Sequence, residues 1–188
     1  MTRQNFKQNP LILLMGKSGS GKTTVANASG LPVLQSYTTR PQREPNEAGH
    51  IFVSRQDFPE PKDRAAYSKF DGNEYCATYE QLYHNAIYVI DPDGVHELLF
   101  KLPEKPPVAV VYLQCHWWVR LWRMVKRGDG IIKSLGRIKH DRKKFKSTAP
   151  LSTKFTDRPD TRFIVLDVNK SNIYSISNKL NQIYFNQV

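Results

Sequence analysis

Short, continuous apolar segments recur along this chain and are separated by longer polar or amphipathic stretches. The apolar segments cover residues 11–15, 31–34, 86–90, 108–113 and 163–166. They are rich in Val, Ile and Leu and do not alternate with polar residues, which is typical of parallel strands covered on both faces. The pattern therefore predicts a buried parallel sheet.

The intervening stretches have helical periodicity. One helix is expected after Gly21 and one near Asp93, and others over 117–127, 131–146 and 171–185. Strands that alternate with helices predict an α/β fold with right-handed crossovers. The stretch 36–80 interrupts this alternation because it is polar and rich in turn residues, so we interpret it as an inserted subdomain.

Length and composition describe an ordinary globular protein. The chain has 188 residues, of which 39% are hydrophobic and 24% charged, which suits one domain and excludes a disordered or collagen-like chain. Its two cysteines cannot form a disulfide scaffold and favour a reducing compartment. The apolar run 11–15 is too short to cross a membrane, so we expect a cytoplasmic protein without membrane contact.

The positive charge is local. The whole chain carries +11, but residues 101–150 hold 13 basic and only 3 acidic side chains. Such a segment suits a polyanion, a cluster of phosphates, or solvent.

Residues 16–23 match the phosphate-binding loop G-x-x-x-x-G-K-[ST] and read GKSGSGKT. A buried strand precedes them and a helix follows, which is the context that phosphate binding requires. The glycines let successive amide groups point at a phosphate chain, and the helix adds its positive end. Lys22 would then contact the terminal phosphates and the Thr23 hydroxyl would bind Mg²⁺. This loop predicts binding of a nucleoside triphosphate, with ATP and Mg²⁺ as the expected cofactors. The residues expected to hold it are Gly16, Lys17, Ser18, Gly19, Ser20, Gly21, Lys22, Thr23 and Thr24.

Two arginines, Arg40 and Arg43, follow the second predicted strand beside hydroxyl side chains. Two guanidinium groups that converge there would suit an oxyanion such as an acceptor phosphate. A surface loop with two solvated arginines is the alternative interpretation.

Several further blocks make the chain resemble the guanylate kinase family. After the phosphate loop they are S-x-T-T-R-x-x-R, G-x-x-F-V-S, F-x-G-N-x-Y, IDPDG, RMVKRGD and RIKHD, in family order between residues 11 and 142. The resemblance implies a three-layer P-loop NTPase fold with a parallel core sheet, an inserted nucleoside-monophosphate-binding subdomain and a helical lid. The implied boundaries are 9–35, 84–127 and 160–188 for the core, 36–83 for the subdomain, and 128–147 for the lid and its flanking helix.

The resemblance also implies transfer of the ATP γ-phosphoryl group to a nucleoside monophosphate, GMP or dGMP first. The implied acceptor-binding residues are Ser36, Arg40, Arg43, His50, Tyr75, Thr78 and Asp91, with Thr23 and Asp91 near the metal. Lys22 and Arg40 would act in catalysis, together with lid arginines at Arg123, Arg127 and Arg137.

Two positions depart from the family. Ala66 stands where the family has the glutamate that reads guanine, and Ala77 stands where it has a base-reading hydroxyl. A carboxylate paired with a guanine edge discriminates sharply between guanine and other bases. Because this carboxylate is absent at position 66, the sequence leaves the identity of the accepted base open.

The basic segment begins with a helix in which Trp118, Leu121, Trp122 and Val125 have the spacing of a buried stripe, so we expect the tryptophans in the core. We interpret the cluster 142–146 as a solvated face, and nucleic-acid binding through 133–146 as possible but not favoured. Three alternatives to a guanylate kinase remain. They are a kinase for another nucleotide or a sugar phosphate, a non-catalytic module that binds a phosphorylated or acidic partner, and a nucleic-acid-dependent ATPase.

Overall fold

The computed structural model describes residues 9–42, 45–70, 72–101, 107–148 and 161–185. Within these ranges a five-stranded parallel sheet forms the core, in the order β2-β7-β1-β8-β9. Its strands are β1 (Leu11–Gly16), β2 (Val33–Leu34), β7 (Ile87–Val89), β8 (Val108–Gln114) and β9 (Thr161–Asp167). Each one coincides with a predicted apolar segment, so the predicted parallel sheet is confirmed.

Within the described residues the predicted helices follow the strands of the core sheet, together with α2, which was not predicted, and the α/β fold is confirmed. They are α1 (Lys22–Ala28), α2 (Tyr79–His84), α3 (Pro92–Lys101), α4 (Trp117–Lys126), α5 (Ile131–Lys144) and α7 (Ile173–Tyr184), with short 3-10 turns η1 (Pro61–Asp63) and η2 (Phe145–Thr148). None of the described helices is both long and apolar enough to cross a membrane.

The central strand β1 explains the layers. All of its side chains are buried, and neighbouring residues point to opposite faces of the sheet. Leu11, Leu13 and Met15 pack in one core cluster with α3. Ile12 and Leu14 pack in the other, with α1 and α7. A strand covered on both faces has no polar side to show, which is why its sequence is a continuous apolar run.

The stretch 36–80 contains a second sheet, which the sequence analysis did not resolve into strands. It has four strands in the order β4-β3-β6-β5. Their bounds are β3 (Ser36–Thr38), β4 (His50–Phe52), β5 (Arg64–Phe70) and β6 (Asn73–Thr78). Ala66 and Ala77 pair across β5 and β6 and belong to the same core cluster as α3. Small side chains at these positions let the second sheet pack closely on the helix.

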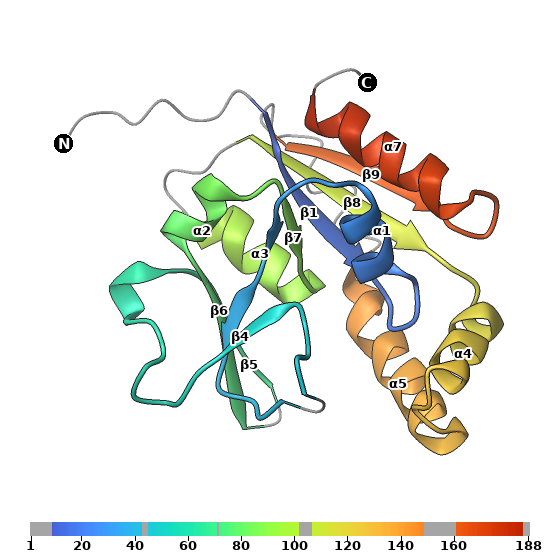
Figure 1. Ribbon diagram of the computed structural model, residues 1–188, viewed down its shortest axis with the longest axis horizontal. Helices are drawn as coiled ribbons and strands as arrows, with labels where there is room; N and C mark the ends of the chain where they lie inside the picture. The colour runs from blue at the N-terminus through green and yellow to red at the C-terminus, as the bar shows by residue number, and fades with distance from the viewer. Residues whose placement is uncertain (1–8, 43–44, 71, 102–106, 149–160, 186–188) are drawn as a thin grey trace.

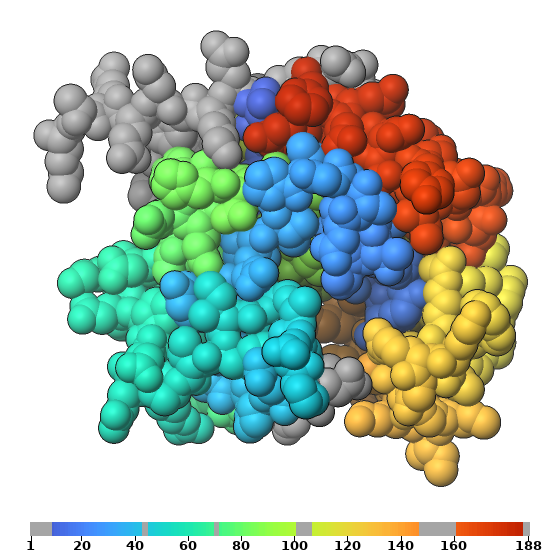
Figure 2. Space-filling view, in the orientation of Figure 1, coloured from blue at the N-terminus to red at the C-terminus, as the bar shows by residue number. Residues whose placement is uncertain are grey.

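The second sheet and the α4–α5 helix pair flank the carboxyl end of the core sheet from opposite sides (Figure 1). Gly128 and Gly130 join the two helices with φ of 93° and 75°, a left-handed region that glycine adopts without strain. The molecule is visibly hollowed between the second sheet and the helix pair (Figure 2).

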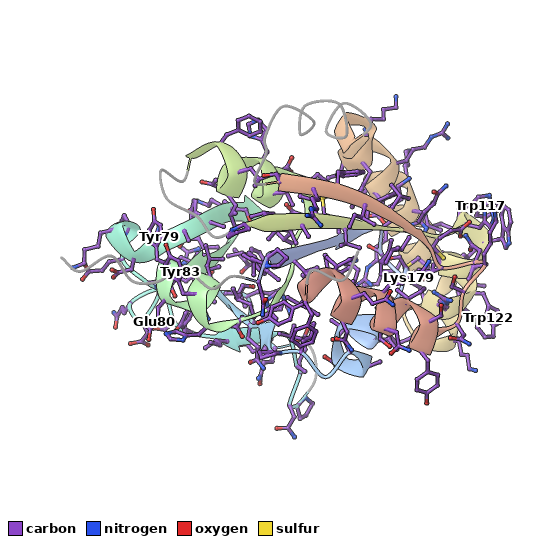
Figure 3. All side chains as sticks on the ribbon, turned by 90° about the horizontal axis from the view of Figure 1, so that it is seen from above. Tyr79, Glu80, Tyr83, Trp117, Trp122 and Lys179 are labelled. Carbon is purple, nitrogen blue, oxygen red and sulfur yellow. The ribbon has the colours of Figure 1, made fainter. Side chains whose placement is uncertain are left out.

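Helix α4 differs from its prediction. Trp118 and Trp122 are 53% and 62% exposed, and Arg120 and Met124 are buried instead. Figure 3 shows Trp117 and Trp122 projecting from this end of the molecule. The expectation of a buried tryptophan stripe is therefore wrong. The helix packs against the phosphate loop, whose backbone carbonyl groups accept from Arg120 and Arg123, so the face that carries Arg120 and Met124 turns inward.

Candidate active site

A cavity of about 310 Å³ lies at the carboxyl end of the core sheet, the usual place for ligands in open α/β folds. Its walls come from three separate parts of the chain. The phosphate loop contributes Gly16, Ser18 and Lys22, and the second sheet contributes residues that include Ser36, His50, Ala66 and Tyr75. The segment after β7 and the end of α5 close the remaining side, with Asp91, Asp141 and Lys144.

The phosphate loop is closely packed and strongly curved. Gly19 and Gly21 have φ of 77° and 92°, and a Cβ at Gly19 would lie 2.8 Å from the carbonyl oxygen of Arg120 in α4. Only glycine fits this position without displacing the helix backbone. Ser20 is 1% exposed, and its buried hydroxyl has no hydrogen-bond partner within the described residues. A curled loop with an unsatisfied buried donor fits a phosphate chain, which supplies acceptor oxygens.

Lys22 begins α1 and lines the cavity. Its Nζ donates to the carbonyl oxygen of Gly16 at 2.6 Å, which holds the side chain folded back along the loop. Burial is the main cause that lowers the pKa of Lys22 to about 8, with Arg120 and Arg127 acting in the same direction and Asp141 opposing them. A phosphate would add negative charge beside this partly buried ammonium group. Thr23 and Thr24 follow on the exposed part of the same helix turn.

The metal site expected from the sequence has few protein ligands. No cluster of three or more His, Cys, Asp or Glu side chains suited to a metal occurs in the described part of the chain. Mg²⁺ is commonly held by one or two protein groups together with substrate phosphates, so this donor set fits the ion when it arrives with a nucleotide. Asp91 lies in the cavity wall, where Gly94 N–H donates to one of its oxygens at 2.8 Å and Lys144 Nζ to the other at 2.7 Å.

The second sheet brings three of the predicted acceptor residues into the cavity. Ser36 Oγ and His50 Nδ1 lie 2.9 Å apart across the parallel pair β3–β4. The rings of His50 and Tyr75 meet edge to face with centroids 5.8 Å apart. Thr78 has a different place, because its hydroxyl accepts from Gln81 N–H and caps α2.

Arg40 lies beside the cavity rather than in its wall. Its guanidinium group donates to both carboxylate oxygens of Glu47, at 2.7 and 3.2 Å, and its charged centre lies 5.2 Å from the ring centroid of Phe52. Hydrogen bonding to Glu47 is the main cause that raises the pKa of Arg40. Arg43 lies outside the described residues, so its convergence with Arg40 is untested.

The two positions that depart from the family pair with each other across β5 and β6, and one of them lines the cavity. Ala66 is 4% exposed and lines the cavity, and Ala77 is fully buried opposite it. Tyr88 borders the same region, and burial raises the pKa of its phenol above the ordinary range. This wall therefore presents a phenol and small apolar groups where the resemblance implied a carboxylate.

The three predicted lid arginines fall into two groups. Arg123 lies against the phosphate loop, with its Nη1 at 3.4 Å from the carbonyl oxygen of Ser20. Arg127 and Arg137 both pair with Asp129 in the joint between α4 and α5, the Arg137 contact being 2.8 Å long. These two cations lower the pKa of Asp129, the Arg127 hydrogen bond most. The last two arginines thus meet at Asp129 and are not among the residues that line the cavity.

Sequence reasoning did not single out Arg120 or Asp141. The Arg120 side chain is 4% exposed, and its Nη1 donates to Asp141 Oδ2 at 3.1 Å. Asp141 also accepts from the backbone N–H of Ser18 at 2.7 Å. One signal was available, because Asp141 is an isolated acidic residue in the strongly basic helix α5.

Comparisons with known proteins agree with this architecture. No family model matches the chain. Guanylate kinases of Neisseria gonorrhoeae and Neisseria meningitidis are 28% identical to it over 156 residues, which is 72% of this chain and 75% of theirs. The crystal structure of guanylate kinase from Anaplasma phagocytophilum matches with a TM-score of 0.57 and 19% identity, over 95% of this chain and 87% of that one.

The structural likeness establishes the shared α/β fold, and the sequence similarity extends along most of both chains. Together with the phosphate loop and the order of the later motifs, the sequence matches support the resemblance of this chain to the guanylate kinases.

Proposed function

We propose that this protein transfers the γ-phosphoryl group of ATP to a nucleoside monophosphate, with GMP and dGMP as the first candidates. The observation that carries the proposal is the single cavity that joins Lys22 of the phosphate loop to His50 and Tyr75 of the second sheet. A phosphate donor and a phosphate acceptor held in one cavity can be aligned for direct transfer.

On the donor side, the loop amides and Lys22 would bind the β- and γ-phosphates, and Thr23 would hold Mg²⁺, which neutralises phosphate charge when bound. Arg123, already against the loop, would add positive charge near the transferring group. On the acceptor side, Tyr75 and Arg40 would hold the monophosphate, and Ser36 would contact the base. Arg40 must then exchange Glu47 for the acceptor phosphate.

In the reaction, an oxygen of the acceptor phosphate forms a bond to the γ-phosphorus. The bond from that phosphorus to the bridging β-γ oxygen breaks, which leaves ADP and a nucleoside diphosphate. The acceptor oxygen is already anionic near neutral pH, so no protein side chain needs to remove a proton. Catalysis then depends on alignment and on positive charge around the transferring oxygens.

Each of the three parts expected from the sequence would have one role in this reaction. Residues 9–35, 84–127 and 160–188 would hold the donor, residues 36–83 the acceptor, and residues 128–147 would close over both. Closure about Gly128 and Gly130 would exclude water and bring Arg127 and Arg137 toward the phosphates.

The apolar wall at Ala66 and Ala77 favours a second candidate, a kinase for a different nucleoside monophosphate. Without a carboxylate at this wall, the guanine edge loses a partner that the guanylate kinase resemblance implies. The chemistry of the donor side is unchanged in this alternative.

A coupled ADP-release assay with ATP and Mg²⁺ tests the proposal, with each common ribo- and deoxyribonucleoside monophosphate added separately. We expect turnover with GMP or dGMP. Turnover with a different monophosphate would support the second candidate. An absence of stimulation by every monophosphate, in a protein that binds ATP, would contradict both.

A further inference from the structure

The phosphate loop already holds an anionic group, the carboxylate of Asp141 from α5. The backbone N–H of Ser18 donates to its Oδ2 at 2.7 Å, and the Ser18 hydroxyl donates to its Oδ1 at 3.3 Å. Asp141 is 7% exposed although it belongs to a helix whose last turn is made of cations. Removing a carboxylate from water to this extent is unfavourable unless hydrogen bonds and opposite charge compensate.

Arg120 supplies that opposite charge from α4. Its Nη1 donates to Asp141 Oδ2 at 3.1 Å and lies 3.3 Å from the carbonyl oxygen of Ser18. Arg120 is 3% exposed, and its buried Nε has no hydrogen-bond partner within the described residues. The Nε–H of this guanidinium group is therefore a donor without an acceptor among the described residues.

The donor set at this point is a built oxyanion site. A backbone N–H, a hydroxyl and a buried guanidinium group converge on one pair of oxygens, and such sets bind carboxylate and phosphate alike. Lys22 of the same loop contributes a further cation nearby, and the Asp141 carboxylate raises the pKa of that lysine.

The position of Asp141 depends on the orientation of α5 relative to the phosphate loop. This helix follows α4 through the joint at Gly128 and Gly130, so rotation there moves Asp141 relative to the loop while Arg120 stays on α4. The lysine one turn later, Lys144, is tied to Asp91 at 2.7 Å and fixes the same end of α5 over the cavity.

We propose that Arg120 is a phosphate-binding residue of the donor site, and that Asp141 occupies the place of a phosphate oxygen there until a nucleoside triphosphate displaces it. This inference rests on the proposed function, because it assigns the ligand of the site to the donor nucleotide. Binding of the triphosphate would release the carboxylate from Ser18 and Arg120, and Arg120 would then donate to a phosphate oxygen. The cost of displacing Asp141 lowers the affinity for the donor.

A purely structural ion pair between α4 and α5 makes a different prediction. In that case, removing the Asp141 charge would leave the affinity for ATP unchanged or lower it along with stability. If Asp141 competes with phosphate, the same change would raise the affinity, and the gain would require Arg120.

Four proteins distinguish the two interpretations: the wild type, Asp141→Asn, Arg120→Gln, and the variant that carries both changes. Asparagine keeps the size of aspartate, removes its charge and retains one acceptor oxygen. Glutamine is shorter than arginine, removes its charge and offers two N–H donors in place of five. The dissociation constant for Mg-ATP is measured by isothermal titration calorimetry without a monophosphate, and inorganic tripolyphosphate serves as a second probe without a base.

We expect Asp141→Asn to bind both probes about tenfold more tightly than the wild type. Arg120→Gln should bind them more weakly, and the double variant should lose the gain of Asp141→Asn. Equal affinity in the wild type and Asp141→Asn would overturn the inference, as would a gain that persists in the double variant.

Controls separate this outcome from other failures. Glu60→Gln removes one negative charge at an exposed residue paired with Lys62, so a general charge effect would appear there as well. Thermal unfolding establishes that each variant is folded, and the double variant retains an uncharged pair if Asp141→Asn alone does not fold. Failure of the wild type and of every variant to bind ATP or tripolyphosphate would contradict the proposed function itself. ATP-dependent turnover of a monophosphate without the tenfold gain would contradict this inference alone.

Discussion

The donor and acceptor sides of the cavity are built in different ways. The donor side consists of a loop whose backbone is fixed by close packing, with Gly19 directly beneath α4 and Ser20 buried. The acceptor side consists of side chains on the second sheet that bond to one another, as Ser36 does with His50 and Arg40 with Glu47. The backbone of the donor side is thus preorganised, and the exchange proposed there concerns only the Asp141 carboxylate on Ser18 and Arg120. On the acceptor side the groups that would hold the phosphate are themselves side chains, and Arg40 must give up Glu47 first.

This difference indicates which part of the cavity would determine specificity for the acceptor. A backbone cradle binds phosphate whatever the rest of the ligand is, so the loop carries no information on the acceptor. Under the proposed function the second sheet would select the acceptor through individual side chains, so a single residue such as Ala66 would alter the substrate without affecting the donor.

The largest expected effect is on the donor side, at Lys22. We predict that Lys22→Ala lowers kcat for monophosphate-dependent ADP formation by about 10²–10³-fold, because it removes a buried cation aimed at the phosphates. Steady-state kinetics in the coupled assay measures this. Lys62→Ala, an exposed lysine of the second sheet region, is the control. A Lys22 variant with wild-type kcat would mean that the loop does not bind the reacting phosphates.

On the acceptor side, we predict that Arg40→Ala lowers kcat/KM for the monophosphate by about 10–100-fold, the range of a charge-assisted hydrogen bond to phosphate. The dissociation constant for ATP should not change. Arg55→Ala is the matched control, since Arg55 is an exposed arginine that donates to a backbone carbonyl, that of Gly72. An equal loss in both variants would show that Arg40 has no special role.

A pH titration tests the charge of Lys22 without a change in shape. Because the pKa of Lys22 is lowered to about 8, the ammonium group loses its proton as the pH rises from 7 to 9. We therefore expect the affinity for ATP to fall about tenfold over that interval. In Lys22→Arg the charge persists at both pH values, so its affinity should vary much less. Parallel pH profiles for the two proteins would contradict the assignment.

The base-binding wall can be tested by restoring the missing carboxylate. We predict that Ala66→Glu raises the ratio of kcat/KM for GMP to that for other monophosphates about tenfold, because a carboxylate accepts hydrogen bonds from the guanine edge. Ala66→Gln, of the same size but uncharged and with one acceptor oxygen, should have a smaller effect. If neither variant changes the ratio, the base does not contact this wall.

The smallest effect is expected in the joint of the lid. Asp129 is partly exposed, so replacing it with asparagine should lower the free energy of unfolding by less than about 1 kcal/mol. Its pKa is lowered in the folded state, so its contribution is present above about pH 4 and is lost as the pH falls through the folded pKa. Denaturant unfolding at pH 7 and pH 3 measures both, and the difference between wild type and Asp129→Asn should be smaller at the lower pH.

The core fold and the donor loop could be predicted because each depends on local sequence. Continuous apolar runs such as that of β1 mark buried strands, and the loop motif needs only a preceding strand and a following helix. The orientation of α4 could not be predicted in this way. Periodicity showed its two faces, but the face that turns inward depends on whether the neighbour is a sheet or a loop of polar backbone.

The sequence also did not predict which charged residues pair with each other. Arg120 and Asp141 are 21 residues apart and meet only because α4 and α5 pack together beside Ser18. Arg40 pairs with Glu47 across a turn, and no motif indicates that the guanidinium group already has a partner. Such contacts are set by tertiary packing, which a single sequence does not encode in a readable pattern.

Identification of the phosphorylated product is the measurement that tests the proposed reaction most directly. The protein is incubated with Mg-ATP and one monophosphate at a time, and the nucleotides are separated and weighed by mass spectrometry. We predict that the nucleoside diphosphate of the accepted base appears in the same amount as ADP. Release of ADP with free phosphate, while every monophosphate stays unchanged, would contradict phosphoryl transfer and indicate an ATPase.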